Sequence, residues 1–263
     1  MLNKLLKYEF KFVFKVIIVF YMLGIFFALL TRIFNIFDSS LMLMIIGKIC
    51  SGITISMIFN IIINNIMRMW YRFKSNLYGD ESYLTHTLPI DKKILYTSKM
   101  LSSVISLFIS FIIITLILFI AYYSKENLET LKNMILPLTD ILDLSMVKML
   151  LSIIFILFLE ITCLLQVGYT GIILGHKMDN HKTAFSVLYG FIIYMGTQTL
   201  TLLSIIIYSI FNKDMLSLFT SNELTDISLL KNVIVLSIII YSLIIIINYI
   251  VNIKIFKKGV NVD

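Results

Sequence analysis

Charged residues are scarce in this chain of 263 residues: they make up 14% of it, against roughly a quarter of a typical soluble protein. Hydrophobic residues make up 59%, and the mean hydropathy is +0.97. The few charges fall in clusters that flank long runs rich in Ile, Leu and Phe. A soluble domain is therefore excluded. Continuous apolar runs of this length predict helices that cross the bilayer, because about 20 helical residues span ~30 Å of hydrocarbon.

Other kinds of site are excluded by what the sequence lacks. The two cysteines, Cys50 and Cys163, lie in predicted spans without CxxC spacing, so we expect small packing residues and no disulfide framework. No GxxxxGK[ST] motif occurs, so we expect no ATPase site and no cofactor in this chain. His176, Asp179 and His181 share one loop, but a metal site needs three or four converging ligands, and we expect no metal site.

The fold class predicted is all-α: a polytopic membrane protein with six transmembrane helices and an N-terminal amphipathic interfacial helix. Residues 1–15 form the interfacial helix, and residues 16–263 form a single six-helix transmembrane domain. The longest hydrophilic segment, 68–93, separates the second span from the third. No internal repeat is evident. The expected spans are 16–36, 41–67, 94–123, 146–174, 184–211 and 231–253.

A row of lysines at helical spacing marks the first fifteen residues. The opposite face carries Leu2, Leu5, Leu6, Phe10 and Val13, which predicts a helix lying in the membrane interface with its lysines toward anionic headgroups. A plain basic flank of the first span is the alternative. No small-x-small cleavage site closes the apolar run that follows, so we expect a retained helix rather than a signal peptide. The lysines are Lys4, Lys7, Lys11 and Lys15.

Basic residues are distributed unevenly between the two sides of the predicted spans. Fifteen of the 22 lysines and arginines fall on one side, and the other seven are mixed with acids. By the positive-inside rule we expect the first side to be cytoplasmic, with both termini on it. The net charge of +7 does not indicate nucleic-acid binding, because the basic residues flank apolar runs and so face the lipid bilayer.

The segment between the second and third spans has the signals of a short helix. Asp80, Glu81 and Ser82 suit a first helical turn, because acids favour the helix N-terminus. Pro89 ends the helix, and Asp91 can cap the third span.

The same short helix carries Tyr83, Leu84 and Leu88 as a rough apolar face. An exposed apolar face on a cytoplasmic turn indicates a docking surface for a partner. A loop resting on lipid is the alternative. No outer or cytoplasmic segment is long enough to form an enzyme domain of its own.

Two stretches resemble one family. The run YGDESYLTHTLPIDKKILYTSKMLSSVI (78–105) resembles the segment after the second span in permease subunits of bacterial ABC exporters, the six-helix family that handles drugs, antimicrobial peptides and lipid-linked polymers. The run GYTGIILGHKMDNHKTAFSVLYG (168–190) resembles the junction of the fourth and fifth spans in that family. The N-terminal helix and the six-span layout agree with it.

The resemblance implies a division of labour between chains. This chain would be the permease, paired with an identical or different second permease subunit. A separate ATP-binding cassette subunit would hold ATP and Mg. The cargo would be amphipathic or hydrophobic, such as an antimicrobial peptide. A coupling helix would dock on the ATPase, with acids contacting basic groups and apolar residues filling a groove. Its residues here are Gly79, Asp80, Glu81, Tyr83, Leu84, Leu88 and Pro89.

Polar residues inside the spans are candidates for a translocation path. Glu160 is the only acid deep in a span, where a charge costs about 2.5–3.5 kcal/mol. Three roles are open for Glu160: binding a cationic group of a substrate, pairing with a basic residue such as Lys48, or a structural role in the protonated form. Thr197, Gln198 and Thr201 in the fifth span line the path or form interhelical hydrogen bonds.

Close helix packing is the expected use of a GxxxG spacing at Gly171 and Gly175. Two other classes of function compete with the exporter. One is a non-transporting assembly or sensory protein of the membrane. The other is an ion-coupled carrier, which would be expected to show charged relays or paired broken helices; only Glu160 qualifies.

Overall fold

The computed structural model describes residues 1–37, 40–142, 145–212 and 228–258. The described residues form helices and no strand, and six of these helices are long and apolar enough to cross a membrane. This confirms the all-α, polytopic fold class. The helices are α1 (Leu2–Ile36), α2 (Leu41–Tyr78), α3 (Ser82–Thr87), α4 (Lys92–Tyr122), α5 (Lys125–Leu142), α6 (Met146–Gly175), α7 (Lys182–Phe211) and α9 (Ser228–Lys257).

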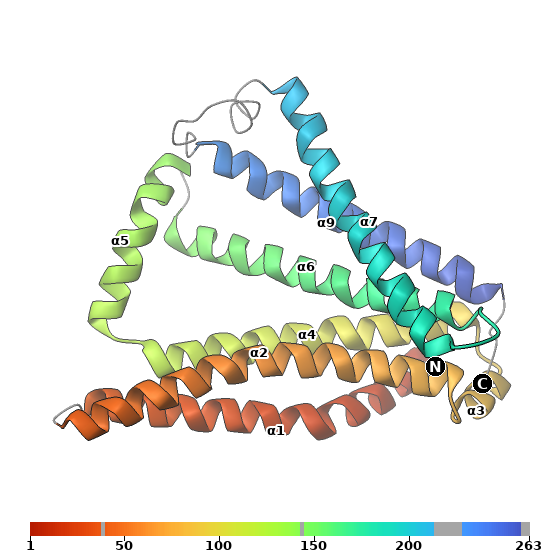
Figure 1. Ribbon diagram of the computed structural model, residues 1–263, viewed down its shortest axis with the longest axis horizontal. Helices are drawn as coiled ribbons and strands as arrows, with labels where there is room; N and C mark the ends of the chain where they lie inside the picture. The colour runs from red at the N-terminus through yellow and green to blue at the C-terminus, as the bar shows by residue number, and fades with distance from the viewer. Residues whose placement is uncertain (38–39, 143–144, 213–227, 259–263) are drawn as a thin grey trace. The chain divides into compact units, whose positions relative to one another are not determined.

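The chain divides into two compact units (Figure 1), an N-terminal unit of Met1–Glu129 and a C-terminal unit of Thr130–Asp263. The N-terminal unit holds α1, α2, α3 and α4, and the C-terminal unit holds α6, α7 and α9. Each unit therefore contains three of the six candidate spans. The expected grouping of residues 16–263 as one domain stays a prediction.

In the N-terminal unit, α1 packs against both α2 and α4. Polar side chains join the helices across this packing. Tyr21 Oη lies 2.7 Å from Ser110 Oγ, and Asn65 Nδ2 donates to Ser110 Oγ at 2.6 Å. Thr31 Oγ1 lies 3.0 Å from Thr54 Oγ1. Buried polar groups must find partners within the protein where water is absent, so these bonds fix how the three helices pack.

Helix boundaries differ from expectation where polar residues continue a helix. Residues 2–15 are the first turns of α1, without a break before the span, and the place of these turns at a membrane surface stays a prediction. Helix α2 runs to Tyr78, well past the expected end at residue 67. The segment between the expected third and fourth spans contains a further helix, α5. Adding a residue to an existing helix is much easier than starting one, so the polar ends of α1 and α2 continue as helix.

The C-terminal unit depends on a close approach between α6 and α7. A Cβ added at Gly171 would lie 2.6 Å from the Ser186 carbonyl oxygen and 2.7 Å from the Gly190 nitrogen. A Cβ at Gly175 would overlap Ser186. The GxxxG spacing is thus used for helix packing, as expected. Helix α9 packs on α6 through buried Cys163, Val167, Ile240 and Ile244, which also gives Cys163 its predicted packing role.

The α6–α7 crossing gives a first test. We expect Gly171→Ala to destabilise the protein by about 1–3 kcal/mol, because the added methyl meets backbone that cannot move aside. Gly190→Ala on the facing helix is the matched control, since its Cβ would meet no atom within 4 Å. This control should be neutral or stabilising by up to about 1 kcal/mol from helix propensity. Thermal unfolding in detergent measures both, and equal stability of the two variants would contradict the close approach.

Candidate functional site

Helix α3 is a short helix at the turn between α2 and α4 (Figure 1). Helix α2 has 38 residues, or about 57 Å of helix, which exceeds the ~30 Å of hydrocarbon. The chain leaves α3 at Leu88, which is extended before Pro89, and Asp91 caps α4 by accepting from the Lys93 N–H at 2.8 Å. The expected short helix, its stop and the cap of the third span are confirmed.

The two faces of α3 differ in exposure. Ser82 and Thr85 are buried against the unit, whereas Tyr83 is 64% exposed and Leu84 is 76% exposed. Leu88, just after the helix, is 47% exposed. The structure therefore presents the three predicted apolar residues on the outside of α3.

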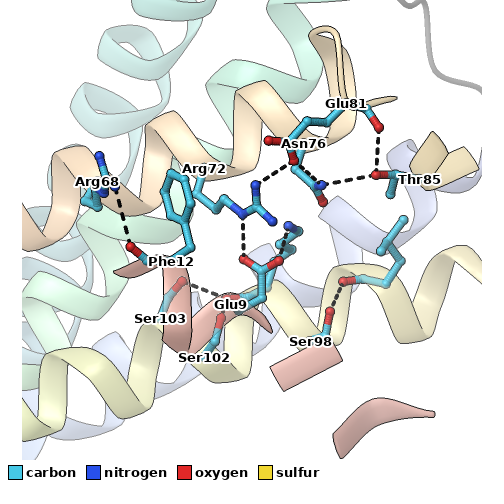
Figure 2. Close-up of polar contacts among 12 residues, drawn as sticks. Glu9, Phe12, Arg68, Arg72, Asn76, Glu81, Thr85, Ser98, Ser102 and Ser103 are labelled. Carbon is cyan, nitrogen blue, oxygen red and sulfur yellow. Dashed lines mark hydrogen bonds and ion pairs between the residues drawn. The ribbon is translucent and has the colours of Figure 1, made fainter. Parts of the chain in front are cut away.

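The inner side of α3 is held to the last turns of α2 (Figure 2). Glu81 Oε2 accepts from Arg72 Nη1 at 2.6 Å and from Asn76 Nδ2 at 2.9 Å. Asn76 Nδ2 also donates to Thr85 Oγ1 at 3.1 Å. Glu81 is thus bonded to α2 of its own chain, at the start of α3. Gly79 and Asp80 form the connection, in which Asp80 is exposed.

Behind Arg72 lies a buried ion pair. Glu9 Oε1 accepts from Lys99 Nζ at 2.6 Å, and Glu9 Oε2 lies 3.4 Å from Arg72 Nε. Lys99 is 2% exposed and Glu9 is 6% exposed. Glu9, Arg72, Glu81 and Lys99 form what we call the charge cluster. Its members come from α1, α2, the start of α3 and α4, and their formal charges sum to zero.

An aromatic ring steadies the arginine of this cluster (Figure 2). Phe12 follows Glu9 by about one turn on α1, and the Arg72 guanidinium lies 4.5 Å from its ring centroid. Arg68, one turn earlier on α2, lies 4.1 Å from the same ring. A cation over a ring is attracted by the ring's negative face, most strongly where water is absent. The Phe12 ring of α1 therefore helps to position the Arg72 guanidinium, which also contacts Glu9 and Glu81.

Glu81 is the member of the cluster that lies outside the candidate spans. The hydrogen bond from Asn76 lowers its pKa, and the positive charge of Arg72 adds to this effect. Burial acts in the opposite direction but is outweighed. Glu81 is therefore a stable anion at neutral pH, which the ion pair to Arg72 requires.

Sequence reasoning missed Glu9, Arg72 and Lys99 as a group. A signal for Glu9 exists: it lies on the apolar side of α1, between Leu6 and Val13, where a free carboxylate is unfavourable. The lysine row is exposed along the other side of α1, as predicted from its spacing. Its members are Lys4, Lys7, Lys11 and Lys15. No sequence signal pairs Glu9 with Lys99, because 90 residues separate them.

The predicted residues of the translocation path belong to the C-terminal unit. Glu160 and Gln198 are half-buried. The hydroxyls of Thr197 and Thr201 donate hydrogen bonds to carbonyls of their own helix at 2.7 and 2.9 Å. Their participation in a path stays a prediction. His176 is buried with Nδ1 2.8 Å from the Ile172 carbonyl oxygen, and within the described ranges no three His, Cys, Asp or Glu side chains gather as metal ligands.

Comparisons of the chain with models of known protein families, with curated proteins and with solved structures found no match. Membership of the exporter permeases therefore stays an expectation, which rests on the resemblance of residues 78–105 and 168–190. Any assignment of function depends on the geometry of this chain.

The charge cluster predicts unequal effects of removing its members. Glu9→Gln should destabilise the protein by about 3–5 kcal/mol, because Lys99 loses its acid and Arg72 keeps only Glu81. Lys99→Met should cost less, since Glu9 still faces Arg72.

Thermal unfolding of both variants and of the double variant tests this order. Because Lys99→Met removes the cation that Glu9→Gln leaves unpaired, the double variant should be more stable than Glu9→Gln alone. Additive losses in the double variant would show that Glu9 and Lys99 do not interact.

The lowered pKa of Glu81 predicts a pH dependence. The ion pair contributes fully above the unfolded pKa, roughly 4.3, and its contribution is lost as pH falls through the lower folded pKa. At pH 7, Glu81→Gln should lose less than about 1 kcal/mol, because Glu81 is exposed and screened. The gap between wild type and variant should close as the pH falls from about 5 to about 3. Unfolding midpoints across this range measure it, and a gap that widens in acid would refute the assignment.

Proposed function

We propose that this chain is the membrane subunit of an ATP-driven exporter and that α3 is its docking helix for a separate ATP-binding subunit. The observation that carries the proposal is the two-sided character of α3. Tyr83 and Leu84 are exposed on one side, and Glu81 ties the other side to the spans. A helix built only to close a turn needs no exposed aromatic and leucine pair.

The charge cluster supplies a route from α3 to three spans. A partner that displaces α3 displaces Glu81, and Glu81 is bonded to Arg72 near the end of α2. Arg72 faces Glu9 on α1, and Glu9 is bonded to Lys99 near the start of α4. Separating Glu9 from Lys99 and Arg72 is costly because these charges are buried, so the ends of α1, α2 and α4 move together. The exposed Glu81–Arg72 pair connects α3 to them.

The apolar side of α3 suits a groove on a folded partner. A short helix laid in a groove is held by a few large side chains, and here these are Tyr83 and Leu84, with Leu88 just after the helix. Asp80 is exposed beside them and is the acid placed to contact a basic group of the partner. Glu81 was expected to share that role, but its bonds to Arg72 and Asn76 favour an internal one.

The lysine row of α1, together with the two lysines at the start of α4, supports a cytoplasmic position for α3. Antiparallel packing brings the beginning of α1 to the end of α2, as the Glu9–Arg72 contact shows. Lys92 and Lys93 open α4 at the same end. Positive residues are retained on the cytoplasmic side, where a soluble ATPase is found. In this proposal both termini are cytoplasmic, the membrane is the bacterial cell membrane, and a second permease subunit completes the pathway for an amphipathic cargo.

Site-directed crosslinking tests the docking partner. A photoreactive amino acid at Leu84, in cells of the source organism, should crosslink to a protein that carries a GxxxxGK[ST] phosphate-binding motif. The same amino acid at Phe59, an equally apolar and exposed position on α2, is the matched control and should label lipid. A protein product at Leu84 without that motif would reject docking on an ATPase and favour an assembly or sensory role. Labelling of lipid alone would also reject docking and favour a segment that rests on lipid.

Uncoupling variants test the function once the complex is isolated. Tyr83→Ala removes a docking side chain, and Glu81→Lys places a third cation beside Arg72 and Lys99. Both should still insert in the membrane but lose most of the coupling between ATP hydrolysis and transport, whereas Phe59→Ala should keep it. Transport and ATP hydrolysis in proteoliposomes measure this. Wild-type coupling in both variants would exclude α3 as the coupling element.

A further inference from the structure

Glu160, an acid of the C-terminal unit, has no ionic partner among the residues that the structure describes. Glu160 is the fifteenth residue of the 30-residue helix α6, so it lies at the middle of a candidate span. It forms no hydrogen bond or ion pair with the residues that the structure describes. Its side chain is half-buried, and a ligand can therefore reach it. This contrasts with Glu9 in the N-terminal unit, which faces two cations.

Two tyrosines from other helices lie in the surroundings of Glu160. Tyr241 of α9 packs against the apolar cluster that includes Cys163, less than one turn after Glu160 on α6. Tyr194 of α7 is next to Ile193, which packs against the same apolar cluster, and Tyr241 lies within the electrostatic influence of both Glu160 and Tyr194. A carboxylate and two phenol rings, supplied by all three spans of the unit, thus share one region.

The apolar residues nearby make this region suited to a greasy ligand. Leu157 lies one turn before Glu160 and is exposed, and Leu164 lies one turn after it and is half-buried. Ile193 of α7 packs on the same cluster as Tyr241. Ligand sites are mostly apolar with a few polar groups that fix orientation, and this combination is present here.

A protein cation is not available from the neighbouring helices of the same unit. In α6 and α7 the basic residues are confined to end turns, at Lys148 and Lys182. In α9 they are Lys231, near its start, and Lys254 and Lys257, in its last turn. None of them lies near the middle of its helix. An acid at mid-span ordinarily faces a cavity or a partner charge, and the described helices α6, α7 and α9 hold no basic residue near mid-span.

We propose that Glu160, Tyr194 and Tyr241 form a binding site for a lipophilic organic cation. The carboxylate neutralises the charge of the ligand, the phenol rings face the cation, and the aliphatic side chains contact its apolar part. This inference deepens the proposed function and depends on it for its meaning: the exporter's cargo would be a cationic amphipathic molecule. The site itself needs no ATPase and can be tested without one.

Equilibrium binding to the purified full chain in nanodiscs tests the site. The probe is tetraphenylphosphonium, and tetraphenylborate is the control of similar shape and opposite charge. Empty nanodiscs supply the background. We expect saturable binding of the cation and none of the anion. Glu160→Gln, which keeps the size of the side chain, should weaken cation binding at least tenfold.

Further variants separate charge recognition from folding. Glu160→Asp keeps the charge and should retain most of the binding. Tyr241→Leu should weaken it several-fold, through loss of the ring. Thr199→Ala, at an exposed position of α7, is the matched control and should bind as wild type does. If Glu160→Gln fails to fold, weaker binding by Tyr241→Leu with wild-type binding by Thr199→Ala supports the site.

Two outcomes would overturn the proposal. The first is equal cation binding by wild type and Glu160→Gln, and the second is no saturable binding by wild type. If the second is accompanied by a change from dimer to monomer in Glu160→Gln, Glu160 is an interface residue. Failure of α3 to crosslink an ATPase would reject the exporter but leave cation binding intact, so the two proposals fail separately.

Discussion

The buried carboxylate of Glu9 is the constraint on which the N-terminal unit depends. Taken alone it would be unfavourable on the inner face of α1, and it is tolerated because Lys99 and Arg72 face its two oxygens. Satisfying it fixes the positions of α2 and α4 against α1. Arg72 also binds Glu81, so the same arginine joins α3 to this packing. One desolvated charge thus connects the packing of three spans to the position of an exposed helix.

The two units differ in how they accommodate an acid on a long apolar helix. Glu9 is fully paired within its unit, and the resulting neutral cluster suits the transmission of a displacement, because its members resist separation. Glu160 is unpaired among the described residues and half-exposed, which suits recognition of a positive ligand. In the proposals made above, one unit responds to a partner chain and the other contacts the cargo. The difference follows from where the cations lie along the helices.

Local signals were sufficient for much of the fold. Apolar runs of about twenty residues predict spans because only a helix satisfies its own backbone in lipid. Asp91 and Pro89 predict the limits of neighbouring helices through capping and proline sterics, and the structure agrees. Gly171 and Gly175 predict close packing because they lack side chains, although the partner, Ser186, is visible only in the structure.

The sequence by itself determined the number of spans, the short helix between the second and third, and the exposure of Tyr83 and Leu84, since periodicity, capping and composition act within a few residues. Tertiary structure decided the rest. The pairing of Glu9 with Lys99 spans 90 positions, and an ion pair leaves no pattern in a single sequence at that separation. Tertiary structure also decided that Glu81 bonds within the chain. The sequence is equally compatible with a bond from Glu81 to a partner protein, because side-chain partners depend on which helices pack.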